Sequence, residues 1–108
     1  MQLTATQMAN LGQHAKTEFL SRAQAYLCGK HAELCERVGP ERIRMIIQLT
    51  LERCQSHQAD TENCVVTLAD LSLGCARDVY ITDGWVQDIL SSEHIDVSEK
   101  ALRLKSYL

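Results

Sequence analysis

The chain has 108 residues, of which 45% are hydrophobic and 23% charged, with one proline and five glycines. These values are typical of one compact soluble domain, so we expect a single folded unit over residues 1–108 rather than disorder or two domains. The net charge of −3 provides no broad attraction to nucleic acid or anionic membranes. No apolar run is long enough to span a bilayer and the N-terminus lacks a signal-peptide pattern, so a cytoplasmic location is expected.

The five cysteines are an odd number, which excludes a fully paired disulfide framework. Free thiols are the consistent expectation for a chain in a reducing compartment. Most of these cysteines recur at helical spacings, as small apolar core residues do. We therefore expect them to act mainly as packing residues.

The first predicted element is an amphipathic helix that starts at Thr4 or Thr6 and runs to about Arg37. A glycine in a helix interior costs about 1 kcal/mol relative to alanine, so a break is expected near Gly29. The apolar side of this helix is predicted from residues spaced three or four apart, namely Met8, Leu11, Ala15, Phe19, Ala23, Tyr26 and Leu27.

The second helix is predicted to begin at Pro40, because proline fits the first helical position, where its missing N–H is not needed. It should end near residues 57–59. A third helix should follow through Cys75, with Asp60 or Thr61 accepting a backbone N–H at its start. Because the link is short, these two helices are expected to lie antiparallel.

Residues 77–82 contain a β-favouring triplet without a partner strand, so we interpret them as a loop with buried side chains. A short fourth helix should follow Thr82 or Asp83. Residues 96–99 have the spacing of a capping box before a fifth helix. The sequence thus predicts an all-α fold, a compact single-domain bundle of about five helices.

One metal-binding alternative arises from residues of the right type at helical spacing. Zinc prefers a tetrahedron of sulfur and nitrogen ligands, and these ligands could come from two helices. The glycine within the first run and the lack of a CxxC motif argue against this, so no metal and no cofactor are expected. The residues of this alternative are Cys28, His31, Cys35, Cys54 and His57.

Catalysis and nucleic-acid binding are also disfavoured. The glycines are scattered, so no phosphate-binding loop is present, and no glycine-bearing turn surrounds a nucleophile. The start of the third helix, residues 62–70, carries acids and no lysine or arginine, unlike a DNA-reading helix. We therefore expect a non-enzymatic protein without a nucleic-acid or membrane partner.

A protein-binding surface is predicted around the single tryptophan and the last helix. There, apolar side chains would act as anchors and the cations as a rim. For Trp85 a core position remains an equal alternative, since large aromatics at helical spacing usually pack inward. The predicted partner-binding residues are Trp85, Leu102, Arg103, Leu104 and Leu108.

The order of features from Arg42 onward resembles small helical proteins encoded in type VI secretion effector clusters, near PAAR-bearing effectors and their adaptor chaperones. The resemblance depends on single residues in helical context. They are residues 43–48, the acidic start of the third helix, residues 71–74 with Asp78, Trp85 with Ile89 and Leu90, and Lys100 with Arg103 and Leu104; Leu3, Thr4, Gln7, Phe19 and Leu27 also fit.

The resemblance implies an accessory, co-chaperone-like role in which the protein binds an effector or its adaptor chaperone in the cytoplasm. It supplies no catalytic residue. Two alternatives stay open: an immunity protein that inhibits a cognate toxin, and a metal- or thiol-dependent helical regulator. Self-association into a homo-oligomer is also left open.

Overall fold

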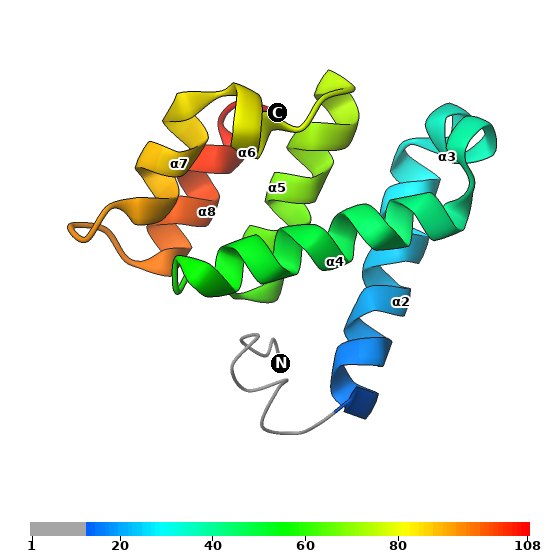
Figure 1. Cartoon of the computed structure of the whole chain (residues 1–108), viewed down its shortest axis with the longest axis horizontal. Helices are drawn as coiled ribbons and strands as arrows, with labels where there is room; N and C mark the ends of the chain where they lie inside the picture. The colour runs from blue at the N-terminus through cyan, green and yellow to red at the C-terminus, as the bar shows by residue number, and fades with distance from the viewer. Residues whose placement is uncertain (1–12) are drawn as a thin grey trace.

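The computed structural model describes residues 13–108 and shows seven helices and no strand in that part of the chain (Figure 1). The all-α class predicted from the sequence is therefore confirmed. The helices in chain order are α2 (Gln13–Lys30), α3 (Ala32–Val38), α4 (Pro40–Ser56), α5 (Glu62–Cys75), α6 (Val79–Thr82), α7 (Gly84–Ser91) and α8 (Val97–Lys105).

Helix α5 is the centre of the packing. It contacts α8 and α4 most extensively, and α2 packs along α4, so one continuous core joins the four longest helices (Figure 1). The radius of gyration is 13.1 Å, close to the value of about 13 Å for a compact domain of roughly 100 residues. The fully buried side chains of α5 in this core include Cys64, Val65, Leu68 and Ala69.

The expected number of five helices is wrong, since the described residues already form seven. The first predicted helix is interrupted at His31, one residue beyond Lys30, so its last part becomes the separate α3. Residues 79–82, expected as a loop, form the single turn α6. The side chain of Val79 is buried as expected there, whereas Ile81 is 66% exposed.

The expected antiparallel pairing of the second and third predicted helices is not confirmed. These helices are α4 and α5, which do contact each other, but Figure 1 shows α5 running steeply across α4. The chain turns between them through Gln58, whose φ of 55° lies in the left-handed region. This crossing lets α5 pack against α4 and α8 at the same time.

Several helix starts follow the predicted capping chemistry. Gly39, with φ of 90°, takes a conformation that residues with a Cβ rarely adopt, and Pro40 then begins α4. The hydroxyl of Thr61 accepts the Cys64 N–H at 3.2 Å, and Asp96 accepts the Glu99 N–H at 2.8 Å. The predicted start at Thr4 or Thr6 lies outside the described residues.

Two further expectations can be compared with the structure. Tyr26, placed on the apolar side of the first helix, is 56% exposed, whereas Phe19, Ala23 and Leu27 are buried as predicted. Within residues 13–108, no helix has the length and apolarity needed to cross a membrane.

A candidate partner-binding groove

The five predicted partner-binding residues do not share one environment. Leu104 is completely buried in the core, whereas Leu102 and Leu108 are 60% and 53% exposed. Arg103 is exposed and pairs with Glu99 on its own helix. Trp85 packs partly against the core, and the ring of Tyr107 stacks on it with centroids 3.9 Å apart. Thus Leu104 cannot contact a partner in the folded chain, and Trp85 is partly covered.

The residues of the metal alternative are divided among three places. Cys28 and Cys35 contact each other at the junction of α2 and α3, while His31 hydrogen-bonds Asp70. Cys54 is buried in the core, and His57 hydrogen-bonds the Tyr80 hydroxyl. Among the described residues, no group of three or more His, Cys, Asp or Glu side chains is placed to hold a metal ion.

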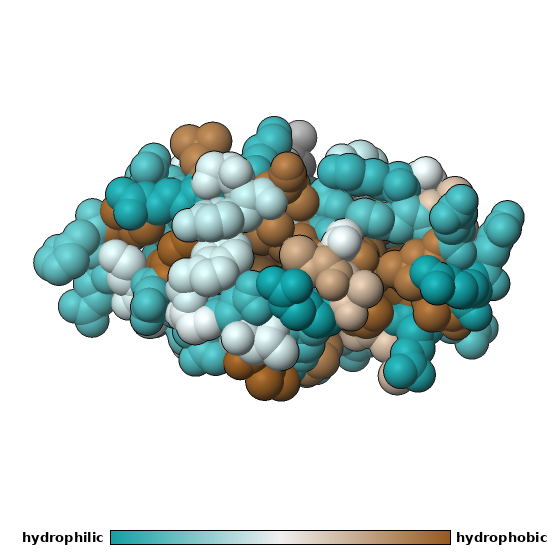
Figure 2. Space-filling view, turned by 90° about the horizontal axis from the view of Figure 1, so that it is seen from above, coloured by the Kyte–Doolittle hydropathy of each residue, from teal (hydrophilic) through white to brown (hydrophobic). Residues whose placement is uncertain are grey.

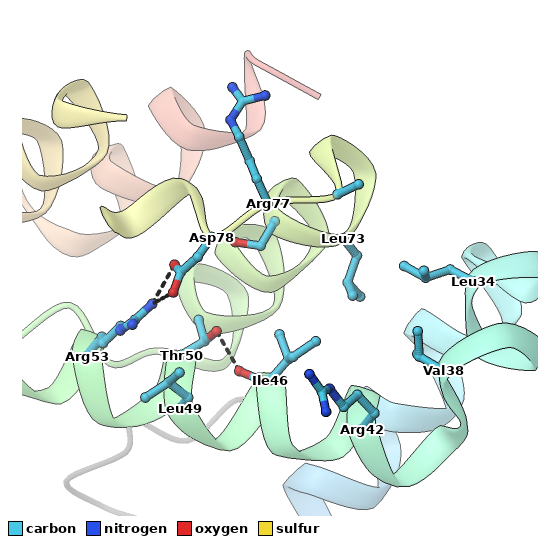
Figure 3. Close-up of a pocket in the computed structure, with 12 residues that line it drawn as sticks. Leu34, Val38, Arg42, Ile46, Leu49, Thr50, Arg53, Leu73, Arg77 and Asp78 are labelled. Atoms are coloured by element: carbon cyan, nitrogen blue, oxygen red, sulfur yellow. Dashed lines mark hydrogen bonds and ion pairs between the residues drawn. The ribbon is translucent and has the colours of Figure 1, made fainter. Parts of the chain in front are cut away.

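A different feature stands out as a binding site, an apolar groove of about 310 Å³ between α3, α4 and the end of α5 (Figure 3). Figure 2 shows apolar surface, bordered by hydrophilic side chains, on the side of the molecule that includes the region between α5 and α3. The residues that line the apolar groove are Leu34, Val38, Arg42, Ile46, Leu49, Thr50, Arg53, Ser72, Leu73, Ala76, Arg77 and Asp78.

The groove exposes apolar surface that residues 13–108 do not cover. Val38 and Leu49 are each 43% exposed, and the neighbouring Met45 on α4 is 66% exposed. Thr50 donates its hydroxyl to the backbone oxygen of Ile46 at 2.7 Å, so this polar group in the lining is already satisfied (Figure 3). A ligand can therefore bury apolar side chains here without leaving the Thr50 hydroxyl unpaired.

Three arginines border the groove, and they differ in whether an acidic side chain of the protein already pairs with them. Nη1 of Arg53 donates to both carboxylate oxygens of Asp78, at 2.6 and 2.7 Å, at one end of the groove (Figure 3). Arg77 pairs with Asp83. Arg42 is exposed and has no hydrogen-bond or ion-pair partner within residues 13–108. An acidic ligand could pair with it without displacing an internal partner.

The end of the groove at Arg53 is held in place by a small polar network. The Arg53 guanidinium carbon lies 4.7 Å from the centroid of the Tyr80 ring, within cation–π range. The Tyr80 hydroxyl in turn lies 2.8 Å from Nε2 of His57. These contacts connect the end of α4 with α6 and hold the Arg53 guanidinium at the rim of the groove.

The opposite wall, formed by α3, is positioned through a buried carboxylate. The side chain of Asp70 on α5 is only 4% exposed, and it binds Nε2 of His31 at 2.6 Å and Nζ of Lys30 at 2.5 Å. The hydrogen bond to Asp70 raises the pKa of Lys30 above its ordinary value. The junction between α2 and α3 is thereby attached to the central helix.

The groove was not identified from the sequence, although a signal for it was present. Ile43, Ile46, Ile47 and Leu51 form an apolar side of the helix that begins at Pro40, and Met45 and Leu49 add apolar side chains beyond it. One side of that helix therefore carries more apolar residues than the core requires. The sequence does not say which other helices complete the groove, because α3 and α5 contribute to it from separate parts of the chain.

Fold and site together define a small all-α domain with an apolar groove bordered by arginines. No family model, curated protein or solved structure matches the chain.

Proposed function

We propose that this protein is a non-enzymatic binding module whose apolar groove takes an amphipathic segment of a partner protein. The observation that carries the proposal is the open groove itself, with half-exposed Leu49 and Val38 beside Arg42, which has no ion-pair partner in the described part of the chain. Burial of apolar surface contributes about 25 cal/mol per Å², so burying the apolar side chains of a partner in the groove would favour binding.

The charge around the groove indicates which segment fits. Arg53 and Arg77 are already paired with Asp78 and Asp83, whereas Arg42 is exposed and has no ion-pair partner within residues 13–108. A segment with two or three apolar anchors at helical spacing and flanking carboxylates would match both features, as in helix-in-groove recognition. The resemblance to type VI secretion accessory proteins supports an effector or its adaptor chaperone as the protein that carries this segment.

The proposal is tested by co-expressing the tagged protein with the secretion effectors and adaptor chaperones of its own host and measuring co-purification. Leu49→Glu places a carboxylate in the apolar groove, and Arg42→Glu reverses the charge of an exposed side chain at its rim. Either variant should weaken binding by about tenfold or more, which corresponds to about 1.4 kcal/mol. Both residues are exposed, so circular dichroism should show an unchanged fold.

Matched controls come from the last helix. Leu102→Glu and Arg103→Glu make the same chemical changes at exposed positions of α8 outside the groove, and they should retain the partner. Loss of binding in these variants, with binding intact in the groove variants, would place the interface on α8 and contradict the groove. If wild-type protein retains no effector or adaptor, the accessory role is refuted; specific retention of a toxin domain would replace it with the immunity role.

A further inference from the structure

Two thiols meet at the junction between α2 and α3. Cys28 lies in the last turns of α2 and Cys35 lies in α3, and their Sγ atoms are 2.7 Å apart. Both side chains are intermediate in exposure, and both are free cysteines. The pair is therefore in contact and within reach of small molecules in solution.

This contact is produced by the helix break and not by helical periodicity. In an unbroken helix, residues seven positions apart are separated by about 10.5 Å along the axis, at about 1.5 Å per residue. A disulfide requires Cα atoms within roughly 7 Å of each other. The helix is interrupted at His31, whose ring is held by Asp70, and the change in chain direction there lets Sγ of Cys35 contact Sγ of Cys28.

We propose that Cys28 and Cys35 are a redox modification site. A small-molecule disulfide such as oxidised glutathione oxidises this dithiol reversibly to an intramolecular disulfide between the two cysteines. One cysteine thiolate attacks a sulfur of the oxidant and releases one glutathione, which leaves a mixed disulfide. The second cysteine attacks that mixed disulfide at the protein sulfur and releases the second glutathione. The protein loses two protons and two electrons, and the oxidant becomes two thiols.

The order of attack follows from the environment of the pair. Burial and the interaction with the neighbouring Cys35 side chain raise the pKa of Cys28 to about 11, so Cys28 is a poor first nucleophile at neutral pH. We assign the first attack to Cys35 and the second to Cys28. Since the thiolate is the reactive form, the rate of disulfide formation should increase as the pH rises.

The other three cysteines serve as internal comparisons. Cys54 and Cys64 are also neighbours, but both side chains are fully buried between α4 and α5. Cys75 is exposed, but it has no cysteine neighbour among the described residues. Contact and access to solvent coincide only at the first pair, which is why the proposal is restricted to it.

The test is to incubate the reduced full-length protein with oxidised glutathione and to map the products by mass spectrometry. Trypsin cleaves after Lys30, so residues 23–30 and 31–37 stay joined only if Cys28 and Cys35 are bonded. We expect this crosslinked peptide, its disappearance on reduction, and loss of two of the five thiols. Cys75→Ser should leave the crosslink unchanged, whereas Cys35→Ser should abolish it.

Three results would overturn the assignment. In the first, both thiols stay open to alkylation while Cys75 takes a glutathione adduct. In the second, the crosslink maps to Cys54 and Cys64. In the third, a stable glutathione adduct on Cys35 persists without closure. Each of these is read on wild-type protein, so the test does not depend on a variant that folds, nor on the proposed function.

Discussion

Replacing the buried carboxylate of Asp70 should destabilise the junction between α2 and α3, which positions one wall of the groove. In Asp70→Asn the negative charge is lost, and the amide keeps one acceptor oxygen where the carboxylate has two. The contact with His31 is 2.6 Å long and both side chains are largely buried, so replacing the charged acceptor by a neutral amide should cost about 2 kcal/mol. Lys30 is 42% exposed and can return to water, so it adds little.

Urea unfolding followed by circular dichroism measures this change. We expect the free energy of unfolding to fall by about 2 kcal/mol with an unchanged m-value, and Tm to fall by roughly 8 °C at about 4 °C per kcal/mol. Lys30→Met is the matched control, since it removes the exposed partner and should have a much smaller effect. If Asp70→Asn unfolds at the same urea concentration as wild type, the carboxylate does not stabilise the junction between α2 and α3.

Two more predictions concern a surface ion pair and the last helix. The hydrogen bond from Arg77 lowers the pKa of Asp83 from 3.8 to about 2, so this pair stabilises the fold fully above pH 3.8 and loses its effect as the pH falls towards 2. An NMR titration of Asp83 should show that midpoint, and Arg77→Gln should raise it. Leu104→Ala should cost about 2–5 kcal/mol because the side chain is fully buried, whereas Leu102→Ala should change stability by less than about 0.5 kcal/mol; similar urea midpoints for both would contradict the burial.

Local signals in the sequence predicted most of the secondary structure. Proline at the first helical position placed the start of α4 at Pro40, and side-chain oxygens at Thr61 and Asp96 marked the starts of α5 and α8. These signals act over three or four residues, which is why a single sequence reveals them. The same reasoning missed α6, because its one turn contains β-favouring residues and has no side-chain cap.

Features that depend on distant residues could not be predicted in the same way. Periodicity placed Tyr26 on the apolar side of its helix, but α4 and α5 cover only the neighbouring positions and leave it exposed. Asp70 interrupts an apolar run in its helix, which marks it as unusual, but its partners lie about forty residues away. The crossing of α4 and α5, and with it the groove, follows from packing among helices and not from the pattern of any one of them.

Helix α3 is the part of the groove that the core holds least firmly. It contributes no fully buried side chain, and only Leu34 and Cys35 pack partly against the core. Its position instead depends on its two ends, through the contact of His31 with Asp70 and through the left-handed conformation of Gly39. Segments with few buried apolar contacts open at the lowest free energy. A partner that enters the groove would therefore displace α3 more easily than the other walls. A disulfide between Cys28 and Cys35 would link this same helix covalently to α2.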